Sequence, residues 1–214
     1  MSRKLLILSV VGLLSIVADQ VSKYLAVAHL TNGFRQSSVV DRLLTFLTPE
    51  RPVRAVREVH VIEDFWHFRY IENPGAAWGL FANLPDPFRT PFFLVVTGAA
   101  MAFIVWMYRR VPARETFLLV ALALVFGGAI GNFIDRLSRG YVIDFIDWHW
   151  QGRADLRWPT FNIADAAISV GVAMMVLDAL RVWVRRRAAR AETGRVTPAP
   201  PPHIAIGDGE RPPL

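Results

Sequence analysis

The sequence predicts a mainly α membrane protein built as a bundle of four transmembrane helices. Of its 214 residues, 53% are hydrophobic, which is more than a soluble domain of this length usually carries. Four apolar segments approach the roughly 20 residues that a bilayer crossing requires: residues 5–30, 91–108, 116–134 and 161–184. The chain has no cysteine, which excludes disulfides, thiol catalysis and Cys-ligated zinc.

The first apolar segment follows Ser2-Arg3-Lys4 and at first sight looks like a secretory signal peptide. Such a peptide ends at a small-residue cleavage site, whereas here the apolar sequence continues past Asp19 and Lys23 to about Leu30. We therefore expect an uncleaved helix. Asp19 and Lys23 are spaced i,i+4 and share a helix face, so they can pair. A structural ion pair is the favoured interpretation, with direct chemistry as the alternative.

Residues 31–89 form a long polar loop between the first two spans. Its first half, to about Glu58, shows no clear period, and we expect it to be irregular. From Val59 to Ile71 the aromatic and β-branched content predicts short strands, with a surface helix as the alternative. Asn73-Pro74-Gly75 then marks a turn, and the small residues after it allow close backbone approach. An ordinary hairpin turn would explain this stretch as well.

The third and fourth spans carry small and polar residues at their ends. Gly127, Gly128 and Gly131 in the third span predict close helix packing. Asn132 and Arg136 share a face at its end. Residues 139–159 read as a short polar loop whose three tryptophans are typical of a membrane interface. Residues 190–214 are rich in Pro, Gly and Ala, and we expect a disordered cytoplasmic tail.

Basic residues mark one side of the membrane. They gather before the first span, between the second and third spans, and after the fourth: Arg3, Lys4, Arg109, Arg110, Arg114, Arg181, Arg185, Arg186, Arg187 and Arg190. The positive-inside rule places this side in the cytoplasm. The net charge of +6 therefore indicates topology or anionic lipid rather than nucleic acid. The unusual polar residues gather at the opposite, extracytoplasmic side.

Two of these polar residues, Asp144 and Asp165, lie in apolar sequence without a basic neighbour. Two carboxylates held together share a proton, and they can supply a base for water and an acid for a leaving nitrogen. The pattern therefore predicts an aspartic dyad that hydrolyses an amide bond. Asn132, Arg136 and Asn162 are candidates to hold the carboxylates or the scissile carbonyl.

Other assignments of these residues stay open. Asp147 is a weaker dyad candidate. Asp144, Asp147 and His149 could ligate a cation, but the chain has neither an HExxH motif nor Cys ligands, and we expect no metal or other cofactor. Four further histidines show no ligand-like grouping in the sequence: His29, His60, His67 and His203. Membrane carboxylates also serve proton- or ion-coupled transporters, and polar pairs can simply hold the helices of a scaffold together.

Five blocks of the sequence resemble the bacterial lipoprotein signal peptidase family, signal peptidase II. In order they are Asp19-Gln20-Val21-Ser22-Lys23, Asn73-Pro74-Gly75-Ala76-Ala77-Trp78-Gly79, Gly127-Gly128-Ala129-Ile130-Gly131-Asn132-Phe133-Ile134-Asp135-Arg136, Val142-Ile143-Asp144-Phe145 and Phe161-Asn162-Ile163-Ala164-Asp165. One block alone would say little. Five in the same order, spread over roughly residues 5–184, make a specific resemblance.

The resemblance implies a four-helix inner-membrane enzyme with a small extracytoplasmic β-cradle, here one peptidase domain over residues 1–189. It implies that signal peptides are removed from prolipoproteins just before a diacylglyceryl-modified cysteine. The family's catalytic aspartates fall on Asp144 and Asp165, and it works without metal. Supporting positions fall on Asp19, Lys23, Asn73, Gly75, Asn132, Arg136 and Asn162. Globomycin-type peptides are its inhibitors, and we expect a monomer surrounded by membrane lipids.

Two segments depart from the family pattern. Residues 33–57 look like an insertion in the first outer loop, and the tail after about residue 190 is longer than usual. The insertion touches no motif residue, but it bears on the shape of the substrate entrance.

Overall fold

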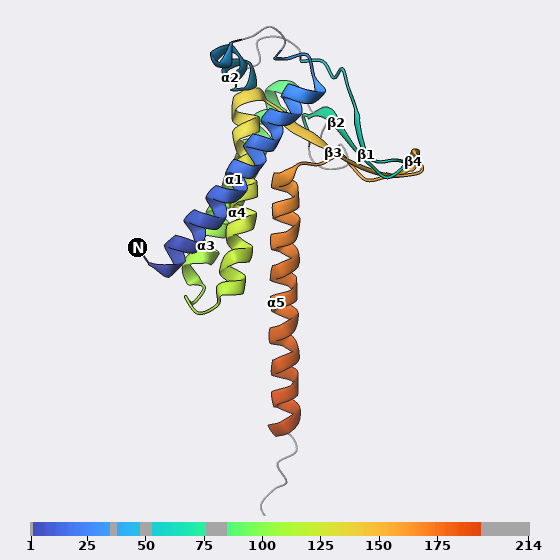
Figure 1. The fold of residues 1–214 in the computed structure, drawn as a ribbon. Coiled ribbons are helices and arrows are strands. Elements are labelled where there is room, and N and C mark those ends of the chain that lie inside the picture. Colours follow the sequence, from blue (N-terminus) through green and yellow to red (C-terminus); the bar gives the residue numbers. More distant parts are fainter. Residues whose placement is uncertain (1, 35–37, 48–52, 76–84, 194–214) are drawn as a thin grey trace, which may run out of the picture. The chain divides into compact units, whose positions relative to one another are not determined.

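A computed structural model of the chain describes residues 2–34, 38–47, 53–75 and 85–193. The described residues are mainly helical and include one antiparallel sheet (Figure 1). They divide into two compact units within the last helix, one ending at Asp178 and the other beginning at Ala179. The functional residues considered below lie in the first unit.

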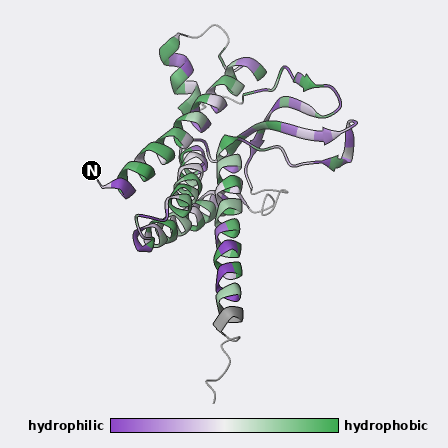
Figure 2. Cartoon of the chain, turned by 60° about the horizontal axis from the view of Figure 1, so that its bottom comes forward, coloured by the Kyte–Doolittle hydropathy of each residue, from purple (hydrophilic) through white to green (hydrophobic). Residues whose placement is uncertain are grey.

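Among the described residues, four helices are long and apolar enough to cross a membrane. They are α1 (Arg3–Leu30), α3 (Asp86–Arg110), α4 (Thr116–Arg139) and α5 (Ile163–Thr193). Hydrophobic residues predominate along these helices, whereas the strands carry many hydrophilic ones (Figure 2). The predicted four-helix membrane protein is confirmed. α4 runs five residues further than expected, so Asp135 and Arg136 lie inside the helix and not beyond it.

α4 is the central helix of the first unit and packs against both α1 and α3. Glycines of α4 lie in close contact with the neighbouring helices α1 and α5. A Cβ added at Gly127 would lie 2.7 Å from Cβ of Ser15 and 2.8 Å from the carbonyl oxygen of Gly12, both in α1. A Cβ at Gly128 would meet the backbone of Ala164 in α5. The close helix packing expected from these glycines is therefore present.

The sheet has the order β1-β2-β3-β4, with all neighbours antiparallel. β1 (Val59–Ile62) and β2 (Trp66–Asn73) confirm the strands expected between residues 59 and 71. Residues 139–159, however, are not a loop. They contain β3 (Val142–Trp150) and β4 (Arg153–Arg157), joined by a turn in which Gln151 and Gly152 have φ angles of 50° and 66°. Positive φ at both central residues is what a tight hairpin needs.

The expectation of an irregular first outer loop is also wrong, because α2 (Val39–Leu47) forms a short helix there. Ser38 and Asp41 cap its start reciprocally: the Asp41 amide donates to the Ser38 hydroxyl, and the Ser38 amide donates to the Asp41 carboxylate. This is a capping box, and Ser38-x-x-Asp41 was a sequence signal for it. Ala76, Ala77, Trp78 and Gly79 of the second block lie outside the described residues, as do parts of the presumed insertion and the tail from residue 194 onward.

Candidate active site

Asp144 lies in the middle of β3 and is 2% exposed. Two side-chain amides donate to its carboxylate, one to each oxygen: Asn73 to Oδ2 at 2.8 Å and Asn162 to Oδ1 at 2.7 Å. Asn73 reaches it because β2 pairs with β3, with Ile71 opposite Asp144 and Asn73 opposite Val142. The sheet therefore joins two motif residues that are 71 positions apart in the chain.

Asp165 lies in the first turn of α5 and takes part in the start of that helix. Its backbone amide donates to Oδ1 of Asn162 at 2.9 Å, and the Asn162 amide donates back to Oδ2 of Asp165 at 3.3 Å. This reciprocal pair is a capping box in which Asn162 precedes the helix. The sequence Asn162-x-x-Asp165 thus fixes the Asp165 carboxylate relative to the helix backbone.

Asn162 and Asn132 connect the two aspartates. The side-chain amide nitrogen of Asn162 reaches Oδ1 of Asp144 and, at 3.2 Å, Oδ1 of Asn132. The amide nitrogen of Asn132 donates to Oδ1 of Asp165 at 2.7 Å. Both aspartates also line the same cavity of about 480 Å³. The predicted dyad residues therefore face one space and share one hydrogen-bond network.

The electrostatic environment changes the acidity of Asp144. Its burial, and secondly the neighbouring Asp165 carboxylate, raise its pKa from 3.8 to about 7. Hydrogen bonds from Asn73 and Asn162 act in the opposite direction but do not cancel the effect. A carboxyl group with such a pKa retains a proton near neutral pH, which is the condition for a pair that contains one acid and one base.

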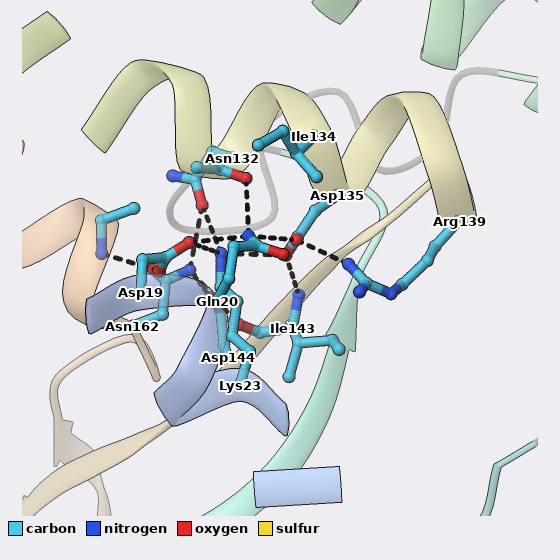
Figure 3. A network of polar contacts seen from close by, with 12 residues as sticks. Asp19, Gln20, Lys23, Asn132, Ile134, Asp135, Arg139, Ile143, Asp144 and Asn162 are labelled. Carbon is cyan, nitrogen blue, oxygen red and sulfur yellow. Dashed lines mark hydrogen bonds and ion pairs between the residues drawn. The ribbon is translucent and has the colours of Figure 1, made fainter. Parts of the chain in front are cut away.

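Behind this site, a buried lysine joins α1 to α4 (Figure 3). Nζ of Lys23 lies 2.8 Å from Asp19, 2.9 Å from Asp135 and 3.0 Å from Oδ1 of Asn132. The side chains of Lys23, Asp19 and Asp135 are all fully buried. The predicted Asp19–Lys23 pair is present. It belongs to a larger network that reaches the cavity residues through Asn132.

Three members of this network were not among the expected site residues. Asp135 is next to Arg136 in the sequence, but it pairs with Lys23 and with Arg139, whose Nη1 lies at 2.6 Å. Gln20 donates to both Asp19 and Asp135. The i,i+4 spacing of Asp135 and Arg139 was the available signal.

Arg136 points elsewhere, toward the Asn73-Pro74-Gly75 turn. Its Nη2 donates to the carbonyl oxygen of Gly75 at 2.9 Å, and its guanidinium lies 4.8 Å from the centre of the Phe93 ring. Arg136 also lines the cavity with Asn73, Asn132 and the two aspartates. The structure thus brings every expected site residue to the cavity or to the layer directly behind it; their roles stay predictions.

Asp147 does not belong to this group. Side chains alternate between the faces of a strand, so Asp147 points away from the face that carries Asp144. It interacts with Arg69 and Arg157, at 3.2 and 3.7 Å, and with the Thr160 hydroxyl. The set Asp144, Asp147 and His149 is therefore not assembled as a cation site.

The histidines nevertheless form a group that sequence spacing does not show. Strand pairing places His60 opposite His67, with the rings stacked at 3.9 Å, and Nδ1 of His67 lies 3.2 Å from Nε2 of His149. One ligand atom each from His67, Asp147 and His149 lies within 4.8 Å of the others. The expectation that His60 and His67 show no grouping is wrong, because the register between distant strands brings them together.

Comparison with known proteins places this geometry in a family. The signature of the family described as signal peptidase (SPase) II matches residues 11–181. A lipoprotein signal peptidase of Anaeromyxobacter sp. (strain Fw109-5) is 50% identical over 167 residues, covering 76% of this chain and 79% of that protein. One of Geobacter metallireducens is 39% identical over 145 residues, covering 68% and 86%.

Solved structures agree. A bacterial membrane enzyme determined by the in meso method at 1.9 Å resolution matches with a TM-score of 0.60 and 28% identity, over 81% of this chain and 92% of that one. A second, at 2.3 Å resolution, matches with a TM-score of 0.61 over 81% and 87%. Together with the four apolar helices, these findings make the chain a multi-pass inner-membrane peptidase that belongs to the signal peptidase II family.

Proposed function

We propose that the chain is an aspartic endopeptidase that removes signal peptides from prolipoproteins by cleaving before a diacylglyceryl-modified cysteine. The observation that carries the proposal is that Asp144 and Asp165 line one cavity and that Asn162 forms hydrogen bonds with both. Family membership supports prolipoproteins as the substrates. The dyad supplies the chemistry that such a cleavage requires.

In the proposed mechanism the two aspartates share one proton. The ionised carboxylate takes a proton from a water molecule, and the water oxygen attacks the scissile carbonyl carbon. The protonated carboxyl donates to the carbonyl oxygen as it gains charge. The proton taken from water then moves to the leaving nitrogen, and the C–N bond breaks. Asn73 and Asn132 hold one carboxylate each, so that neither side chain rotates away from the substrate.

The lipid part of the substrate enters from the bilayer. Alongside the polar groups, Ile168 and Val170 of α5 line the cavity, and Val170 is 53% exposed on the helix surface. The two acyl chains would remain in lipid against this face while the peptide reaches the aspartates. By the positive-inside rule this end of the bundle faces the periplasm. We also propose that the enzyme acts as a monomer and binds globomycin-type peptides in the same cavity.

The test is cleavage of a diacylglyceryl-modified prolipoprotein by the purified full-length protein. Asp144→Asn and Asp165→Asn should each abolish cleavage while each variant still unfolds in a cooperative thermal transition. Asp155→Asn is the matched control, because Asp155 is exposed on β4 and contacts only Arg153 among the interactions described. A chelator should not reduce the rate. A near-wild-type rate in either dyad variant would refute the pairing.

Two other classes of protein compete with the peptidase proposal: a proton- or ion-coupled transporter and a membrane scaffold. Either interpretation predicts no cleavage by the wild-type protein under any condition. A transporter also needs polar groups along its whole path across the membrane. Here the buried polar side chains of α1 and α4, including Asp19, Lys23, Asn132 and Asp135, gather toward the sheet end of the two helices. This distribution favours a site at one depth.

A further inference from the structure

The short helix α2 carries its apolar face on the outside. Val40, Leu43, Leu44 and Leu47 follow the i, i+3, i+4, i+7 spacing of one helix face. Val40 is 64% exposed, Leu43 48% and Leu47 45%. A nine-residue helix with such a face exposed to water would be unfavourable, because each buried aliphatic side chain stabilises by about 1.5–3 kcal/mol relative to exposure.

One residue of α2 points the other way and fixes the helix to the bundle. Phe46 is 6% exposed, its ring lies 5.5 Å from that of Tyr24, and the Arg139 guanidinium lies 4.0 Å from its ring centre. The Nε of Arg139 also donates to the carbonyl oxygen of Phe46. α2 is therefore attached through Phe46 to α1 and to the end of α4.

These contacts set the depth of α2 relative to the membrane spans. Arg139 is the last residue of α4. Tyr24 lies six residues before Leu30, the end of α1, which is about 9 Å at 1.5 Å per residue. Phe46, in the last turn of α2, thus lies level with the last turns of two membrane spans. At that depth a helix borders the headgroup and acyl region, which is where amphipathic helices insert their apolar faces.

Basic side chains from α2 and from neighbouring segments line a cavity next to α2. The cavity has a volume of about 710 Å³, and its basic lining residues are Arg42, Arg57 and His29. Apolar and aromatic side chains also line it: Tyr24, Leu25 and Phe34. Leu25 and Val21 of α1 are exposed below it, 47% and 52% respectively. A phosphate group near two arginines, with an acyl chain along the apolar helix below, matches this combination of charge and apolar surface.

From this arrangement we propose that α2 is an interfacial lipid-binding helix. Its face formed by Val40, Leu43, Leu44 and Leu47 lies in the membrane leaflet on the sheet side, and the neighbouring cavity binds the phosphate of a phospholipid from that leaflet through Arg42 and Arg57. The proposal does not depend on the aspartic mechanism. It assigns to the presumed insertion a role in holding the sheet end of the protein at the membrane surface.

Depth is tested by site-directed fluorescence, which suits this chain because it has no native cysteine. The test variants are Val40→Cys and Leu43→Cys, and the control on the polar face is Asp41→Cys. Each full-length variant is labelled at its cysteine with an environment-sensitive fluorophore and placed in phospholipid bilayers. In the control variant, the hydroxyl of Ser38 can still accept from the backbone amide of residue 41 and cap the start of α2. Labels at Val40 and Leu43 should be quenched by brominated lipid and protected from aqueous iodide, whereas the label at Asp41 should show the reverse.

Two outcomes of this experiment would overturn the proposal. Equal access of iodide to all three labels would mean that α2 stands in water. Protection of Val40 and Leu43 from both quenchers would mean that protein, and not lipid, covers the apolar face.

The phosphate site is tested by native mass spectrometry of the full-length protein released from bilayers. The wild type should retain one phosphatidylglycerol, and the double variant Arg42→Gln/Arg57→Gln should lose it at least tenfold more readily. Arg54→Gln is the control, since Arg54 is exposed in the same loop but does not line the cavity. Diacylglycerol, which has no phosphate, should not be retained, and inorganic phosphate should not displace the lipid. Equal retention by the double variant and the control, or equal retention of diacylglycerol, would refute the site.

Discussion

The side-chain amide of Asn132 donates a 2.7 Å hydrogen bond to Oδ1 of Asp165. The carbonyl oxygen of the same amide accepts from Lys23 at 3.0 Å and from Asn162 at 3.2 Å. Two donors on the oxygen side hold the amide in one orientation, with its NH₂ group toward Asp165. Lys23, in the layer behind the cavity, is thus connected to Asp165 of the proposed dyad through Asn132.

Asn132→Asp should therefore slow cleavage strongly while leaving the protein folded. The change replaces a donor with a third negative charge beside Asp165, and loss of such an oriented donor typically lowers kcat by about 10²–10³-fold. The measurement is the cleavage rate at saturating substrate. Asn32→Asp serves as the control, because among the interactions of the described residues the Asn32 side chain takes part through its oxygen, which accepts from the Arg54 amide. A rate within about twofold of wild type for Asn132→Asp would show that this bond does not position Asp165.

Stability should depend on pH through Asp144. Because burial and Asp165 raise its pKa in the folded protein from 3.8 to about 7, the folded state binds a proton that the unfolded state has already released. The contribution of Asp144 to stability is present below pH 3.8 and is lost as the pH rises to about 7. The thermal transition temperature of the wild type should fall over this range relative to that of Asp144→Asn. Parallel curves for the two proteins would contradict the assigned shift.

Cleavage should follow the same titration. If the pair works with one shared proton, activity should decline above about pH 7 as that proton is lost. The pH profile of kcat/KM, measured with one prolipoprotein in detergent, reports this directly. A rate that keeps rising well above that pH would exclude a required proton on Asp144.

Removing the buried cation should destabilise the bundle. Lys23→Met leaves the fully buried carboxylates of Asp19 and Asp135 facing each other without Lys23 between them. Breaking one partner of a buried ion pair costs about 3–5 kcal/mol, so the thermal transition should fall markedly and cleavage should be lost with it. Arg153→Gln, which removes the exposed partner of Asp155, should leave the transition unchanged. A wild-type transition in Lys23→Met would show that α1 and α4 do not depend on this network.

The glycine contacts between α1 and α4 give a second test of packing. In Gly127→Ala the new methyl group would lie 2.7 Å from Cβ of Ser15 and 2.8 Å from the Gly12 carbonyl oxygen. Helix separation at this crossing should cost about 1–3 kcal/mol, seen as a lower thermal transition. Gly98→Ala is the matched change, since nothing lies within 4 Å of the added Cβ. It should be neutral or stabilising by up to about 1 kcal/mol. Equal effects at the two positions would contradict the packing.

The sequence was most informative where structure is local or imposed by the membrane. A span must be a long apolar helix, so all four were predictable, although their ends were not. Asp144 and Asp165 could be paired in advance because each lies in apolar sequence without a nearby cation. Asn162-x-x-Asp165 also carried its own helix-start signal.

Contacts between distant segments were harder to predict. The sequence predicts a loop over residues 139–159, where the structure has β3 and β4. β3 pairs with β2, some 70 residues earlier, and a local sequence pattern does not show that pairing. The sequence does not predict α2, because its apolar face has only four residues and lies between polar stretches. The neighbour of Asp135 in the sequence is Arg136, whereas its charge is balanced by Lys23 on another helix and by Arg139. For β3 and for the Asp135–Lys23 pair, the deciding partner lay outside the local sequence window.

The capping box at Asn162 and Asp165 ties the integrity of a helix end to the chemistry. The same four atoms that begin α5 also aim a carboxylate at the cavity. Helix ends normally fray first, within the native state and without global unfolding. Here such fraying would separate Asp165 from Asn132 and, through Asn162, remove one of the two amides that hold Asp144. Hydrogen exchange at the Asp165 backbone amide therefore reports the fraction of folded molecules in which this helix start is open and Asp165 is displaced from the cavity.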